Sequence, residues 1–332
     1  MKKTAKIAFI FALMITLAGC GTAKVDLGTI ATVDGEKVPQ ALFEYSLMDV
    51  QESLKDEEKA PEDWEKGKID GQNATEYAKE KAQEKVKEIY AIRAWAKKNG
   101  VTITSEDNKK IDEEIAALKK DIGGQAKFEE ALAEAGINEA VWKEVRLNAM
   151  YEENAKKKYV DGLTEKQKKD YYLNEMKLAK HVLIKTKEED GTKYSESKIA
   201  ENKAKALLVL KKAKSGADFD KLIQEYSEDP GSKSIKEGYL VGRFSNMVKP
   251  FLDSTFSLKY GEVSPELVES EYGFHIIKVY KTLEDKFKEN AYAKTGYSDV
   301  DNNMWGSEKE RIVKEAKINL EQKKYDEVTI KK

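Results

Sequence analysis

The stretch Glu271–Tyr280 reads EYGFHIIKVY and places His275 inside an apolar run that is typical of a strand. The chain has only two histidines, and His181 lies in a similar run, LAKHVLIKT, at residues 178–186. Short apolar runs that are rich in β-branched residues predict strands with at least one buried face. A highly charged protein is therefore expected to keep both of its imidazoles in the interior of a sheet.

Composition limits the kinds of protein that this sequence can encode. The chain has 332 residues, enough for two or three domains, and is 36% charged and 40% hydrophobic with a formal net charge of -2. This balance argues against a dedicated nucleic-acid binder, which would carry a basic excess. The apolar share supports packed cores rather than wholesale disorder. One cysteine and two histidines cannot assemble the usual zinc site, and we expect neither a metal nor a cofactor.

Patterning along the chain separates a mixed region from helical regions. Strands and helices alternate over residues 174–284, which suits one compact α+β domain. Residues 20–173 are mainly a run of helices, in which Thr104 with Asp107 resembles a capping box. Residues 285–332 are too few to form a domain and are expected to pack back on those helices. The α+β domain would then be an insertion in a mostly helical domain.

The N-terminus has the features of an export signal. Lysines at positions 2, 3 and 6 precede an apolar run, Ile7–Leu17, which is too short to span a bilayer and fits a signal peptide over residues 1–19. The run ends in Leu-Ala-Gly-Cys, which resembles the bacterial lipobox. That resemblance implies a lipid on Cys20 and a location on the outer face of the cytoplasmic membrane. An ordinary signal peptide with a chance cysteine is the alternative.

Several enzyme classes lack their motifs, because no Gly-rich phosphate loop and no GxSxG nucleophile elbow is present. Five segments between Met176 and Thr282 instead resemble the parvulin (PpiC-type) peptidyl-prolyl isomerase domain. They are AKHVLIK, YSEDPGSKS, GYLVGRFSNMVKPF, FSLKYGEVS and YGFHIIKVY. Such a domain behind a lipobox and between helical segments is similar to the PrsA foldase lipoproteins, whose helical domain is also similar to that of SurA.

The resemblance implies an α+β fold, a small antiparallel sheet with surrounding helices, and a set of site residues. The expected catalytic residues are Asp229, His181 and His275. The expected substrate-binding residues are Leu240, Met247, Phe251, Ser270 and Asn246. Two departures concern the stretch GYLVGRF, where Tyr239 replaces the usual Asp, and Asn246, which replaces a Gln. An acidic loop at residues 188–190 argues against dependence on a phosphorylated substrate.

Isomerisation of an X–Pro bond makes and breaks no bond to the substrate, which favours a structural role for the two histidines over proton transfer. The function expected is that of a membrane-anchored foldase that isomerises X–Pro bonds in exported proteins, with chaperone activity in its helical domain. Its partners would be unfolded exported proteins and the membrane, but no nucleic acid, and a homodimer is left open. A non-enzymatic holdase is the alternative. A solute-binding lipoprotein would need paired α/β lobes that the helical half lacks.

Overall fold

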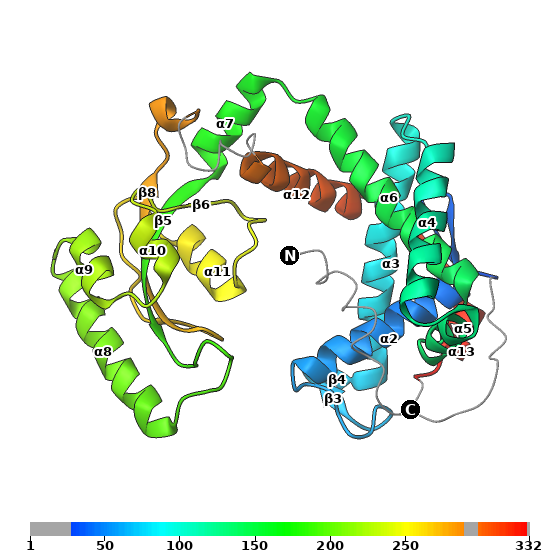
Figure 1. Ribbon diagram of the computed structural model, residues 1–332, viewed down its shortest axis with the longest axis horizontal. Helices are drawn as coiled ribbons and strands as arrows, with labels where there is room; N and C mark the ends of the chain where they lie inside the picture. The colour runs from blue at the N-terminus through cyan, green and yellow to red at the C-terminus, as the bar shows by residue number, and fades with distance from the viewer. Residues whose placement is uncertain (1–27, 289–297, 331–332) are drawn as a thin grey trace. The chain divides into compact units, whose positions relative to one another are not determined.

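The computed structural model describes residues 28–288 and 298–330, and the chain forms two compact units (Figure 1). One unit contains the described residues up to Asp161 together with those from Lys309 onward, and the other contains Gly162–Glu308. The predicted signal peptide and Cys20 lie outside the described residues. None of the helices in the described ranges has the length and apolar character needed to cross a membrane.

The first unit is built mainly of long helices. Its elements are β1 (Thr29–Val33), β2 (Glu36–Pro39), α2 (Gln40–Asp56), β3 (Lys68–Ile69), β4 (Gln72–Asn73), α3 (Ala74–Lys98), α4 (Ser105–Asp121), α5 (Gln125–Glu134), α6 (Glu139–Asp161), β9 (Ile318–Leu320) and α13 (Gln322–Glu327). The capping box predicted at the start of α4 is confirmed, because the side chains of Thr104 and Asp107 each bond the other's backbone N–H.

The C-terminal segment returns to this first unit through a short strand. Strand β9 pairs antiparallel with β1, with Val33 opposite Ile318 and Ala31 opposite Leu320, and the sheet order is β2-β1-β9. Tyr325, in the helix that follows β9, packs edge-on against Phe43 with ring centroids 5.5 Å apart. The two ends of the described chain therefore share one small core.

The second unit is the predicted α+β fold. Its elements are α7 (Glu165–Glu175), β5 (Lys177–Lys185), α8 (Glu196–Lys214), α9 (Phe219–Tyr226), α10 (Pro230–Ser234), β6 (Tyr239–Val241), α11 (Lys249–Ser257), β7 (Val268–Ser270), β8 (Gly273–Lys281), η1 (Glu284–Lys286) and the first part of α12 (Ser298–Glu315). An antiparallel sheet of order β6-β5-β8-β7 lies at its centre. Both histidine-containing runs are the two long central strands.

Side chains alternate between the two faces of this sheet and divide the core in two. Val182, Ile184 and Ile276 pack with α8 and α9, whereas Ala179, Ile277 and other residues of the opposite face pack with α11. Figure 1 shows these two groups of helices on opposite sides of β5 and β8. The histidines fall on the α11 side, since His181 is opposite Ile277 and His275 is opposite Leu183.

The second unit is wider than the domain expected from the sequence, 174–284. Thr282 donates a hydrogen bond from its hydroxyl to the buried Tyr172 carbonyl at 3.1 Å, which ties the end of β8 to α7. Lys168 of α7 forms an ion pair with Asp301 of α12 at 2.7 Å. Helix α7 and the beginning of α12 therefore pack as parts of this unit.

Candidate active site

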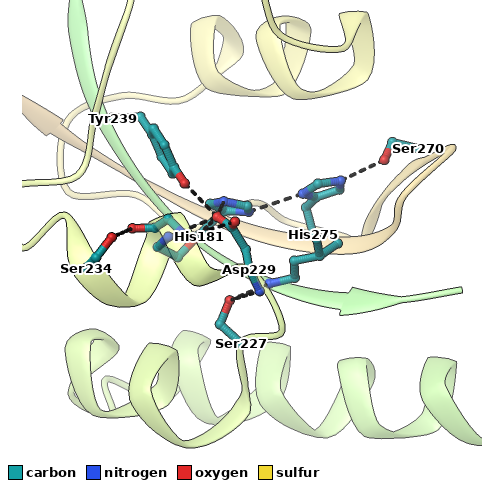
Figure 2. Close-up of polar contacts among 10 residues, drawn as sticks. His181, Ser227, Asp229, Ser234, Tyr239, Ser270 and His275 are labelled. Atoms are coloured by element: carbon teal, nitrogen blue, oxygen red, sulfur yellow. Dashed lines mark hydrogen bonds and ion pairs between the residues drawn. The ribbon is translucent and has the colours of Figure 1, made fainter. Parts of the chain in front are cut away.

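Two nearly parallel imidazoles, joined side by side through their Nδ1 atoms, form the centre of the site (Figure 2). His181 on β5 and His275 on β8 are 6% and 4% exposed, and their Nδ1 atoms lie 3.2 Å apart. The rings lie diagonally across adjacent strands, because His181 is opposite Ile277, which is two positions along β8 from His275 and on the same face. Phe251 of α11 meets His181 edge-on at a centroid distance of 5.2 Å, which fixes the rings from above the sheet.

Asp229 holds the other end of His181. Its backbone precedes α10, and its side chain caps that helix by accepting from the N–H groups of Gly231 and Ser232. Pro230 occupies the first helical turn, where its missing N–H costs nothing. The carboxylate accepts from five donors in all, the others being the Ser232 hydroxyl at 2.6 Å, the Tyr239 hydroxyl at 2.7 Å and His181 Nε2 at 2.9 Å.

For a pair of neutral rings, these contacts allow one direction of hydrogen bonding. The Nε2–H of His181 donates to Asp229, so its Nδ1 accepts from the Nδ1–H of His275. The Nε2 of His275 then accepts from the hydroxyl of Ser270 at 2.7 Å, and that oxygen accepts from the N–H of Tyr272. Every ring nitrogen has a partner, so the pair needs no bound water or ion.

The ionisation of the site follows from this arrangement. Burial lowers the pKa of His275 to about 3, with the neighbouring His181 charge acting in the same direction. Burial alone would raise the pKa of Asp229, but hydrogen bonds from His181, Ser232 and Tyr239 outweigh it and hold that pKa far below its usual range. At neutral pH the site therefore contains an ionised, fully satisfied carboxylate and an uncharged His275.

A cavity of about 510 Å³ opens over the histidine pair. Its lining combines the two imidazoles with apolar and aromatic side chains and a few polar groups. The lining residues are His181, Tyr239, Asn246, Met247, Val248, Phe251, Glu271, Tyr272 and His275. Most of these come from the segment between β6 and α11 or from the turn between β7 and β8.

The structure brings most of the predicted site residues together, but it places some of them in the cavity wall and others behind the histidines. His181, His275, Asn246, Met247 and Phe251 line the cavity. The side chains of Asp229 and Ser270 instead contact the outer nitrogens of the two histidines. These two residues support the rings rather than line the cavity.

Leu240 is a correction to the predicted pocket. On β6 it pairs with Leu178, and the alternation of the strand turns it to the opposite face from Tyr239 and Val241. Tyr239 lines the cavity in its place and also donates to Asp229. The period-two pattern of the segment YLV could have shown that Tyr239 and Leu240 face opposite sides, but not which side carries the site.

Within the described ranges, no group of three or more His, Cys, Asp or Glu residues is placed to hold a metal ion. The sequence model of the PPIC-type PPIASE domain matches residues 162–282, which span both histidines and the segment from Asp229 to Phe251. Together with the sheet and the paired imidazoles, this match defines the chain as a peptidyl-prolyl cis-trans isomerase of the PpiC, or parvulin, type.

A relative that this chain covers over most of its length identifies the family. The chain is 32% identical over 254 residues to the foldase protein PrsA of Geobacillus sp. (strain WCH70), covering 74% of this chain and 82% of that protein. It is 34% identical over 178 residues to PrsA of Staphylococcus aureus (strain Newman), covering 53% of each. The crystal structure of PrsA from Bacillus subtilis is similar with 22% identity and a TM-score of 0.27, covering 81% of this chain and 94% of that one. The chain belongs to the PrsA foldase family.

Proposed function

We propose that this foldase isomerises X–Pro bonds of exported proteins in the cavity over the histidine pair, outside the cytoplasmic membrane. Rotation about that bond must overcome a barrier of roughly 18–20 kcal/mol because it breaks amide resonance. Unassisted, it takes tens to hundreds of seconds, which is slow enough to limit folding. The observation that supports the proposal best is a largely apolar cavity whose floor is a buried, hydrogen-bonded imidazole pair.

In this proposal the apolar wall of the cavity holds the proline ring. Met247 and Phe251 line the cavity and also pack into the core beneath α11, so their positions are fixed by the fold. A proline ring seated there would leave the preceding carbonyl over the rim that contains Asn246 and Tyr272. The site could then favour the twisted amide, which is less polar than the planar one, over the ground state.

Asp229 acts indirectly in this scheme. Its carboxylate already accepts from five donors, which leaves little capacity to accept from a substrate amide. Its role would be to hold His181 in one tautomer, so that the ring pair keeps one orientation beneath the cavity. We therefore assign Asp229 and Ser270 as positioning residues, and the two imidazoles as the floor on which the substrate lies.

Substitution of Met247 by alanine tests the pocket. Loss of its side chain from the cavity wall is expected to lower kcat/KM for a proline-containing tetrapeptide about tenfold, since burial of a side chain of this size against the substrate contributes about 1.5–3 kcal/mol. The assay follows cis-to-trans conversion by the full chain, and Leu207→Ala serves as a matched control. Leu207 is 50% exposed on α8, which packs on the other face of the sheet.

The same variant separates catalysis from chaperone activity. We assign chaperone activity to the helical unit, which contributes none of the residues that line the cavity. The Met247→Ala protein should therefore still suppress aggregation of an unfolded test protein. If neither the wild type nor the variant catalyses isomerisation, the result supports the alternative of a non-enzymatic holdase.

Lipid attachment at Cys20 is a further part of the proposal, and it rests on the Leu-Ala-Gly-Cys sequence. A lipid chain contributes about 0.8 kcal/mol for each buried CH₂ group, so more than one chain is needed for stable anchoring. Cells that express the chain should incorporate labelled fatty acid into it, and Cys20→Ser should abolish the label. Label that persists in this variant contradicts the anchor.

A further inference from the structure

Helix α12 contacts the loop that supplies part of the cavity wall. The loop between β6 and α11 carries Asn246 and Met247, and two residues earlier Phe244 donates its backbone N–H to the Asn303 side-chain oxygen at 2.7 Å. Asn303 lies on α12, belongs to the same unit and is 1% exposed. A buried amide that accepts from a loop backbone is a specific contact rather than a chance one.

A short series of hydrogen bonds continues from Asn303 to Met247. The Asn303 amide donates to the Ser245 hydroxyl at 3.3 Å, and the same hydroxyl accepts from the Gly242 N–H at 2.9 Å. The N–H of Met247 in turn donates to the Ser245 carbonyl at 2.8 Å. The Asn303 side chain thus bonds the loop at Phe244 and at Ser245, the residue next to Asn246 in the cavity wall.

Two glycines allow helix and loop to approach closely. A Cβ atom added to Gly306 of α12 would lie 2.2 Å from the Phe244 ring, and one added to Gly242 would lie 2.2 Å from the Asn303 oxygen. Neither distance is compatible with a real contact, and both atoms that would be struck are held in the interface. The fit of loop against helix therefore depends on the absence of side chains at these positions.

The beginning of α12 is itself fixed to the isomerase unit. Tyr171 of α7 donates its hydroxyl to the Asn303 carbonyl at 3.2 Å and lies 3.0 Å from the Ser307 hydroxyl. On α7, Lys168 lies one turn before Tyr171 on the same face, and it forms an ion pair with Asp301 of α12. A helix held in this way can act as a rigid support for the loop.

We propose that Asn303 is a positioning residue for the isomerase, and that α12 sets substrate affinity by holding the loop of Asn246 and Met247 against the cavity. The inference rests on the proposed seating of the proline ring against Met247. It also gives a role to the unusual stretch GYLVGRF, because Gly242 and Phe244 are the residues that meet the helix.

Two variants of the full chain test the proposal by different routes. Asn303→Ala removes the polar contact. In Gly306→Ala the new methyl group displaces the Phe244 ring, although alanine raises the helix propensity of α12. Each should raise KM about tenfold, the loss expected from a buried hydrogen bond or a displaced loop, with kcat within about twofold. Asn302→Ala is the matched control, since Asn302 is the exposed neighbour on the same helix.

Local readouts separate positioning from a general loss of structure. The methyl NMR signal of Met247, one of seven methionines, should shift in both variants. Adding Phe244→Ala to Gly306→Ala should restore KM, because the clashing ring is removed. Unchanged KM and an unchanged Met247 signal in both variants, with a lower melting temperature only, would overturn the proposal. If Met247→Ala itself leaves KM unchanged, the failure lies with the proposed pocket and not with Asn303.

Discussion

Replacing His275 with alanine is expected to remove isomerase activity and stability together. The ring is 4% exposed and exchanges hydrogen bonds with His181 and Ser270 at 3.2 and 2.7 Å. Its loss leaves a cavity and an unpaired Nδ1 on His181. We expect a cost of about 3 kcal/mol, the size typical of a large-to-small substitution in a core with a lost buried hydrogen bond.

The coupled loss follows from the structural role assigned to the histidine pair. Isomerisation transfers no proton. Because the pKa of the His275 ring is about 3, the ring stays uncharged around physiological pH and makes a poor acid or base there. Thermal unfolding and the tetrapeptide assay on the same preparation measure both effects. An unchanged melting temperature with abolished activity would contradict the assignment and favour a direct catalytic role.

A matched variant strengthens this experiment. The side-chain amide of Asn in His275→Asn can occupy the position of the ring Nδ1 and donate to His181, although it cannot reach Ser270. We expect this variant to recover part of the stability and part of the activity lost in His275→Ala. Recovery of one property without the other would separate the two roles of the ring.

The fold could be predicted from the sequence where the signals were local. Alternating and apolar runs marked the strands that became β5 and β8, and Thr104 with Asp107 marked the start of α4. The assignment of both histidines to one site came from the family resemblance and not from a local pattern. No pattern within either run specifies that His275 lies opposite Leu183, which is a property of the register between distant strands.

The parts that the sequence did not predict depend on contacts between distant segments. Phe244 and Asn303 are 59 residues apart, and neither has a local pattern that indicates the other. Tyr239 was recognised only as a departure from the family, whereas its hydroxyl is one of the five hydrogen-bond donors to the Asp229 carboxylate. Leu240 was assigned to the pocket from the family resemblance, although its place on β6 turns it to the opposite face from Tyr239.

Acidification is expected to destabilise the isomerase unit below about pH 6 through His275. Burial lowers its folded pKa to about 3, with the His181 charge in support, whereas the unfolded ring titrates near 6.5. Between these values the unfolded chain binds a proton that the folded chain does not, so stability falls as the pH falls. The slope is about 1.4 kcal/mol per pH unit, or about 2 kcal/mol between pH 6 and pH 4.5.

Asp229 adds to this effect only at lower pH. Its folded pKa is also depressed, by hydrogen bonds that outweigh burial, so its contribution is present above the unfolded value near 3.9 and is lost as the pH falls below it. The two groups therefore act in the same direction but in successive windows. Loss of stability between pH 6 and pH 4.5 should come from His275, and further loss below about pH 4 should include Asp229.

The chain's two histidines make this prediction measurable residue by residue. Ring NMR signals should show His275 neutral from pH 7 to pH 4.5 in the folded state, while denaturant unfolding at each pH gives the stability. In His275→Asn the slope between pH 6 and pH 4.5 should flatten, and the loss below about pH 4 should persist. Equal slopes in the two proteins would mean that the buried ring is not the source of the acid sensitivity, and that its neutral state contributes nothing to holding the floor of the cavity.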